Sequence, residues 1–183
     1  MKTTIAIIGP SGRYDTEFLT ANVYQKMIAK TKKIITEKLK MNPNDVELIS
    51  GGAAWSDHVA VKLFVDKFVT DVTLCITAKW DSTNKKYIES SGKYDCGRIS
   101  NFYHAKFTDV VGYSTLEELD TAITEGINIK YFPGFKNRNN EIANAKYLIA
   151  FSFDDTAPSQ GGTLHTWTAS KSKTKININI KKL

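Results

Sequence analysis

The chain has 183 residues, 42% of them hydrophobic and 24% charged, which is typical of a soluble globular protein and excludes a disordered or fibrous class. No apolar stretch approaches the roughly 18–20 residues of a membrane span, and the apolar run at residues 3–9 predicts a first strand, not a signal peptide. Two cysteines argue against a disulfide framework and favour a reducing, cytoplasmic setting, while the net charge of +6 permits an anionic partner such as a nucleotide or nucleic acid.

Strand and helix patterns alternate along the whole chain. Short apolar runs predict strands, and apolar positions at helical spacing predict helices between them. The predicted strands are 3–9, 46–50, 71–78, 146–153 and 175–183, and the predicted helices are 15–40, 55–68, 99–111, 114–126, 136–145 and 160–173. Residues 127–134 are predicted only as a short connection. This order predicts one domain over residues 1–183, a Rossmann-like α/β fold with a doubly wound, mainly parallel sheet and helices on both faces.

Residues 79–98 interrupt this pattern with a polar excursion rich in Lys, Ser and Gly. Long excursions in compact domains are usually functional or mobile. Two interpretations stay open: a lid over a ligand pocket, or a surface loop.

Three glycine-containing segments follow predicted strands and open predicted helices. In doubly wound sheets, ligands lie beyond the carboxyl ends of the strands. Glycine there either lets the backbone approach a phosphate or ribose, or lets the chain pack tightly on itself. The first two segments, "GPSGR" and "SGGAAWSD", supply the candidate ligand residues Gly9, Ser11, Arg13, Gly51, Gly52 and Asp57.

The third segment places Gly161, Gly162 and Thr163 at a predicted helix amino terminus. Unpaired N–H groups and the helix dipole favour an anion at such a position. Arg138 and Asn139, in the helix before the fourth predicted strand, could bind a phosphate in a fork. Three such loops on one sheet edge, with two arginines nearby, indicate a phosphate-bearing ligand.

The histidines show no metal-type spacing, so no metal site and no resident cofactor are predicted. His58 and His104 are expected to be structural, while His165 is a candidate for contacting a ligand phosphate or transferring a proton. Trp55 has two interpretations, a base-stacking residue at the ligand rim or an anchor in the core. The aromatic residues of "NFYHAKF" are expected to lie in the core.

Four motifs, "IAIIGPSGR", "ISGGAAWSDHVA", "RNNEIANAKYLIAF" and "GGTLHTWTAS", occur in this order. They resemble those of the SLOG superfamily, which includes the DNA-processing protein A family and the LOG proteins, often labelled lysine-decarboxylase-like. The resemblance covers nearly the whole chain except residues 79–135. It implies a Rossmann-like domain that binds nucleotides, nucleotide derivatives or single-stranded DNA, and it implies a homo-oligomer.

LOG proteins hydrolyse the N-glycosidic bond of nucleoside 5′-monophosphates and resemble this chain at Arg138 and at Gly162-Thr163. Their motif continues with an acidic pair, whereas this chain has Leu164, His165 and Thr166, so a carboxylate is absent there. The candidate catalytic residues are Arg138, Glu141 and His165, with Asp57 or the Asp154–Asp155 pair as possible substitutes for the carboxylate.

Two functions therefore stay open. The first is binding of a nucleoside monophosphate, NAD or an ADP-ribose-like ligand, by a sensor or sequestering protein or by an N-glycosidase. The alternative is a single-stranded DNA-binding protein similar to DNA-processing protein A, with Trp55, Lys79 and Trp80 stacking on bases or contacting phosphates.

Overall fold

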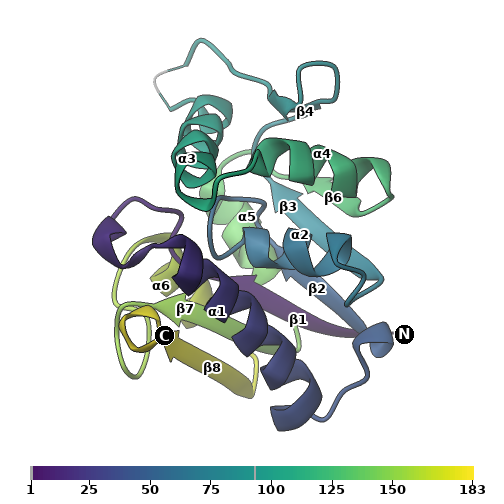
Figure 1. The fold of residues 1–183 in the computed structure, drawn as a ribbon, viewed down its shortest axis with the longest axis vertical. Coiled ribbons are helices and arrows are strands. Elements are labelled where there is room, and N and C mark those ends of the chain that lie inside the picture. Colours follow the sequence, from purple (N-terminus) through teal and green to yellow (C-terminus); the bar gives the residue numbers. More distant parts are fainter. Residues whose placement is uncertain (1, 93) are drawn as a thin grey trace.

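The computed structural model describes residues 2–92 and 94–183, and over these residues six strands form one parallel sheet (Figure 1). The order in the sheet is β6-β3-β2-β1-β7-β8, and every neighbouring pair is parallel. The strands are β1 (Thr3–Ile8), β2 (Val46–Ser50), β3 (Asp71–Ile76), β6 (Asn128–Tyr131), β7 (Tyr147–Ser152) and β8 (Thr174–Asn179). The predicted Rossmann-like α/β class is confirmed.

Helices cover both faces of the sheet, as Figure 1 shows. One layer contains α1 (Ala21–Lys33), α2 (His58–Val65), α3 (Cys96–Val111) and α4 (Thr115–Thr124), which pack on one another. The other layer contains α5 (Phe135–Ile142) and α6 (Gly161–Ala169), which also pack together. A π-helical turn (Ile34–Lys38) extends α1, and 3-10 turns lie at Thr16–Phe18, Pro43–Asp45 and Ile180–Lys182.

The continuous apolar sequence of β1 follows from its central place in the sheet. Ile5 and Ile7 belong to the larger core cluster, whereas Ala6 and Ile8 belong to the smaller one. Successive side chains of a strand point to opposite faces, so a strand covered on both faces must be apolar throughout.

The β6 strand was missed at the sequence level. Residues 127–134 were predicted as a connection, but Asn128–Tyr131 pairs with β3 at the sheet edge. Most of its side chains are exposed, and it has no continuous apolar run. Ile127, Ile129 and Tyr131 do alternate with polar residues, a short strand pattern that the prediction overlooked. The first predicted helix also begins later than expected, at Ala21, because the Thr20 hydroxyl caps it by accepting a hydrogen bond from Val23 N at 3.2 Å.

The polar excursion at 79–98 contains a hairpin of β4 (Trp80–Asp81) and β5 (Lys86–Tyr87). Trp80 Nε1 donates a hydrogen bond of 2.9 Å to Asp120 on α4, and the buried Tyr87 hydroxyl donates one of 2.6 Å to the Gly52 carbonyl. These two aromatic residues anchor the hairpin to the body of the domain.

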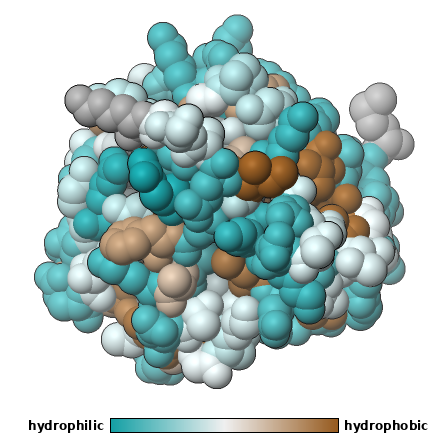
Figure 2. Space-filling view, turned by 90° about the horizontal axis from the view of Figure 1, so that it is seen from above, coloured by the Kyte–Doolittle hydropathy of each residue, from teal (hydrophilic) through white to brown (hydrophobic). Residues whose placement is uncertain are grey.

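Hydrophobic residues occur only in small separate patches on the end of the molecule seen in Figure 2, which is otherwise mostly hydrophilic. Among the described residues, none of the helices combines the length and the apolar character that crossing a bilayer requires.

Candidate functional site

A cavity of about 290 Å³ lies beyond the carboxyl ends of β1 and β7. The chain passes from β1 to β2 on one side and reaches β7 on the other, so these two strands flank the topological switch point of the sheet. Ligands of doubly wound folds bind at this point. The cavity is lined by the loops after both strands and by residues of α3, α5 and α6.

Most of the predicted ligand residues line this cavity. They are Gly9, Ser11, Arg13, Asp57, Arg138, Asn139, Gly161, Gly162 and Thr163. Gly51, Gly52, Glu141 and His165 are not among its lining residues. Glu141 pairs instead with Lys130 at 3.0 Å, and His165 Nε2 lies 2.9 Å from Asn140 Oδ1.

Gly51 and Gly52 make room for side chains of the chain itself. A Cβ on Gly51 would collide with the Asp57 carboxylate and lie 2.7 Å from Arg138 Nη1. Gly52 has φ +68°, in the left-handed region, and a Cβ there would lie 2.8 Å from the Tyr87 hydroxyl. Of the two interpretations of this glycine pair, the structure supports tight packing.

A chain of polar contacts crosses the cavity floor from Asp57 to α6. Asp57 Oδ2 lies 4.0 Å from Arg138 Nη1. Arg138 Nε and Nη2 donate to Asn139 Oδ1 at 3.1 and 2.9 Å, and Asn139 Nδ2 donates to the Gly162 carbonyl at 3.5 Å. The first two residues of this chain come from segments far apart in the sequence, so tertiary packing brings the carboxylate and the guanidinium together.

Asp57 is a perturbed acid in this cavity. Its residue is only 5% exposed, and burial raises its pKa from 3.8 to about 6, although the Arg138 charge and hydrogen bonds from the backbone of Ala53 and Gly51 oppose the rise. A carboxyl group with a pKa near neutrality, facing a cleft beside a cation, is characteristic of binding and catalytic sites.

The amino terminus of α6 opens onto the same cavity. No side chain caps it, and Gly161 has φ +67°, which favours glycine. Asp154 orders the preceding loop by accepting hydrogen bonds from Ser159 N at 3.1 Å and Ser159 Oγ at 2.8 Å. An uncapped helix start of this kind can bind an anion through its N–H groups.

No protein-family model matches the chain. It is 33% identical over 183 residues to uncharacterized protein R261 of Acanthamoeba polyphaga mimivirus, a match that covers 98% of this chain and 97% of the viral protein. The chain belongs to the same family as this viral protein. The match spans nearly all of both chains.

The α3 helix supplies cavity residues that sequence reasoning missed. Ile99, Ser100 and Tyr103 line the cavity, together with Tyr14 of the β1–α1 loop. The aromatic residues of this helix were predicted to be core, which is right for Phe107 and wrong for Phe102, which is 52% exposed. The helical spacing alone did not show which aromatic side chain faces the core.

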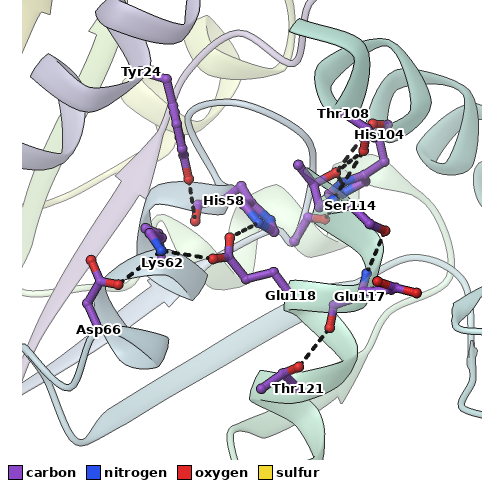
Figure 3. A network of polar contacts seen from close by, with 12 residues as sticks. Tyr24, His58, Lys62, Asp66, His104, Thr108, Ser114, Glu117, Glu118 and Thr121 are labelled. Atoms are coloured by element: carbon purple, nitrogen blue, oxygen red, sulfur yellow. Dashed lines mark hydrogen bonds and ion pairs between the residues drawn. The ribbon is translucent and has the colours of Figure 1, made fainter. Parts of the chain in front are cut away.

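Contacts between α2 and α4 fix the turn that carries Asp57 (Figure 3). His58, the first residue of α2, lies with Nε2 2.9 Å from Glu118 Oε2, and Lys62 donates to Glu118 Oε1 at 3.0 Å. Tyr24 on α1 donates to the His58 carbonyl at 3.3 Å. Since Asp57 immediately precedes His58, this network positions the cavity carboxylate from the side of α4.

His104 is also structural, as predicted. Its Nε2 donates to the Gly52 carbonyl at 3.1 Å and its Nδ1 lies 3.0 Å from Thr115 Oγ1. Burial lowers its pKa to about 3, so the ring is neutral. Within the described residues, no group of three or more His, Cys, Asp or Glu side chains is placed to hold a metal ion.

Trp55 is a core anchor and does not lie at the ligand rim. It is 3% exposed and packs on Phe107 with a centroid distance of 4.5 Å and on Tyr24 at 6.2 Å. The stacking role considered for it in single-stranded DNA binding is therefore wrong for this conformation.

Proposed function

We propose that the cavity at the switch point binds a nucleotide or nucleotide derivative through its phosphate. The observation that supports this is the convergence of Arg13, Arg138 and the uncapped amino terminus of α6 on one cavity. Guanidinium groups bind phosphate oxygens in pairs, and a helix start adds backbone N–H donors. The SLOG resemblance of the glycine loops implies the same class of ligand.

The size of the cavity favours a single nucleotide over NAD. Ligand pockets commonly have volumes of about 300–1,000 Å³, and this cavity of about 290 Å³ is at the small end of that range. A nucleoside monophosphate is the ligand class that we propose first, with an ADP-ribose-like compound as the larger candidate.

N-glycosidic hydrolysis is the reaction that such a complex would support. Of the carboxylates considered from the sequence, Asp57 lies buried in the cavity next to Arg138, whereas Glu141 lies outside it. Asp154 also lines the cavity, but its carboxylate accepts two hydrogen bonds from Ser159, and Asp155 pairs with Lys182 outside the cavity. In this proposal Asp57 takes a proton from a water molecule whose oxygen bonds to the anomeric carbon. The bond from that carbon to the base breaks, and the electron pair goes to the base nitrogen, which takes up a proton from solvent water as the base leaves. Asp57 then returns its proton to solvent.

The test is to incubate the protein with nucleoside monophosphates, NAD and ADP-ribose, and to separate the products by chromatography. A free base identifies an N-glycosidase, and a compound retained intact identifies a binding or sequestering protein. Arg138→Ala should lose tenfold or more in ligand affinity because a charge-assisted contact is removed. Arg98→Ala is the matched control, since Arg98 is an exposed arginine of α3 that is not among the lining residues.

Single-stranded DNA is the outcome to test against. Affinity for DNA falls steeply with salt through counterion release, whereas affinity for a ligand with one phosphate falls little. Binding of DNA alone, with such a salt dependence, would contradict the proposal. Homo-oligomerisation and a cytoplasmic location also stay predictions, and the former can be checked by light scattering.

A further inference from the structure

We infer that α3 and the β1–α1 loop form a subsite that selects ligands carrying a planar aromatic ring, such as a nucleobase, over sugar phosphates alone. This inference rests on the proposed function and specifies which part of the ligand provides selectivity. The side chains that carry it are Tyr14, Ile99 and Tyr103, all of which line the cavity with Arg13.

The helix α3 brings one row of side chains from the core into the cavity. Ile99, Tyr103 and Phe107 are four residues apart and therefore share one helix face. Phe107 is fully buried against Trp55 and Tyr24, whereas Ile99 and Tyr103 are only partly buried and line the cavity. The packing of Phe107 in the core thus fixes the orientation of α3, and with it the position of Tyr103 at the cavity.

The β1–α1 loop lies against this helix. The neighbouring Tyr103 hydroxyl is the main reason that the pKa of Arg13 is raised above its ordinary value. Gly12 has φ +91°, which favours glycine, and a Cβ there would lie in ordinary contact with the Tyr103 ring, at 3.9 Å, and more tightly against Trp55 Nε1, at 3.0 Å. Tyr103 also packs edge-to-face on Phe102, with centroids 5.3 Å apart. Tyr103 is therefore held in place before a ligand arrives.

Tyr14 supplies a second aromatic surface. The residue is 50% exposed although it lines the cavity, so part of it is accessible to a ligand. Aromatic rings bind the faces of nucleobases by stacking, and a neighbouring guanidinium adds cation–π attraction. A sugar phosphate has no flat face, so it would gain nothing from this wall of the cavity.

The cavity offers both chemistries to one ligand. Arg138 and the start of α6 supply groups suited to phosphate, and Arg13 adds a third beside Tyr14 in the loop after β1. The tyrosines that we assign to the ring lie on α3 and in that loop, and Phe135 of α5, 5.3 Å from the Arg138 guanidinium, is a further aromatic lining residue. A ligand that satisfies both sets has an anionic group at one end and a planar ring at the other. A mononucleotide has this form.

The test compares the four ribonucleoside 5′-monophosphates with ribose 5-phosphate by titration calorimetry. Stacking on one aromatic side chain predicts that at least one nucleotide binds about tenfold or more tightly than ribose 5-phosphate. Tyr103→Ala and Tyr14→Ala should each weaken nucleotide binding more than ribose 5-phosphate binding, because both ligands share the phosphate contacts but only the nucleotide carries a ring that stacks. The Tyr14 variant keeps the test informative even if Tyr103→Ala disturbs α3.

The matched control is Tyr131→Ala, because Tyr131 is 52% exposed on β6 and is not among the lining residues. Equal affinities of the wild-type protein for nucleotides and ribose 5-phosphate would overturn the aromatic subsite but leave the phosphate site intact. The same conclusion would follow if the tyrosine variants weakened both ligand types equally. Binding of neither class would overturn the proposed function as well.

Discussion

Replacing Asp57 by Asn should stabilise the fold at neutral pH. Burial raises the pKa of this carboxyl from 3.8 to about 6, so the folded protein binds its proton more tightly than the unfolded chain does. The folded state loses stability as pH rises from 3.8 through about 6, and the loss is complete once the folded-state carboxyl is fully ionised, about one pH unit higher. The difference between the two pKa values corresponds to ~3 kcal/mol of unfolding free energy. Asn resembles the protonated acid and stays uncharged at every pH, so the substitution removes this loss of stability.

The loss of a partner for Arg138 works in the opposite direction. The figure of ~3 kcal/mol already contains this attraction, because Arg138 lowers the same pKa. In the Asp57→Asn protein the guanidinium would keep its contacts with Asn139 Oδ1 and with the Gly51 carbonyl at 3.4 Å. A net gain in stability is therefore expected.

The assay is urea unfolding of the wild-type protein and Asp57→Asn between pH 4 and 8. The difference in unfolding free energy should be smallest at pH 4 and reach its full value above pH 7. Asp109→Asn, at an exposed carboxylate of α3, is the control for a general change in net charge. A variant that is less stable than wild type at pH 7.5 would refute this reasoning and make Asp57 and Arg138 a stabilising ion pair.

Three further substitutions test the packing. Gly52→Ala should cost more stability than Gly112→Ala, because both glycines have positive φ but a Cβ on Gly112 meets nothing within 4 Å; thermal unfolding of the pair isolates the collision from the backbone strain of about 1 kcal/mol. Trp55→Ala should cost about 3–5 kcal/mol in urea unfolding and Phe102→Ala less than about 0.5, and equal costs would contradict the burial of Trp55. Glu118→Gln should cost about 1–3 kcal/mol of unfolding free energy at pH 7. Burial opposes ionisation of the Glu118 carboxyl, but the hydrogen bonds from His58 and Lys62 outweigh the effect of burial and hold its pKa below 4.5. Its contribution to stability is present above pH 4.5 and lost as pH falls, so a cost that persists at pH 3 would contradict the ion pair.

The central strands and the edge strand β8 were predicted from the sequence, whereas the edge strand β6 was missed. Residues 3–9 were predicted close to the bounds of β1, because burial on both faces requires an apolar run there. The β6 strand has no such requirement, since one of its edges and most of its side chains face solvent. Its alternation of Ile127, Ile129 and Tyr131 with polar residues is short, and its pairing with β3 is a tertiary contact.

The loops that line the cavity could also be predicted, because strand-to-helix turns at the switch point have a local sequence signature. The contributions of α3 could not. Tyr103 and Phe107 follow the same helical spacing, and only the docking of α3 on the domain separates a cavity residue from a core residue. The contact of Tyr87 with Gly52 joins residues 35 positions apart, which periodicity cannot show.

The glycine pair at 51–52 connects the packing of the chain with the cavity of the proposed function. Gly51 contributes no surface to the cavity, yet the space that its missing Cβ leaves is where the Asp57 carboxylate and the Arg138 guanidinium meet. Gly52 gives its carbonyl to Tyr87 and His104, which tie the β2–α2 loop to the hairpin and to α3. The β2–α2 loop is therefore held by the hairpin and by α3, the helix that carries Tyr103. The loop leads to Asp57, which lies beside Arg138. Tight packing of the chain on itself is what places both sets of side chains that we propose for ligand binding in one cavity.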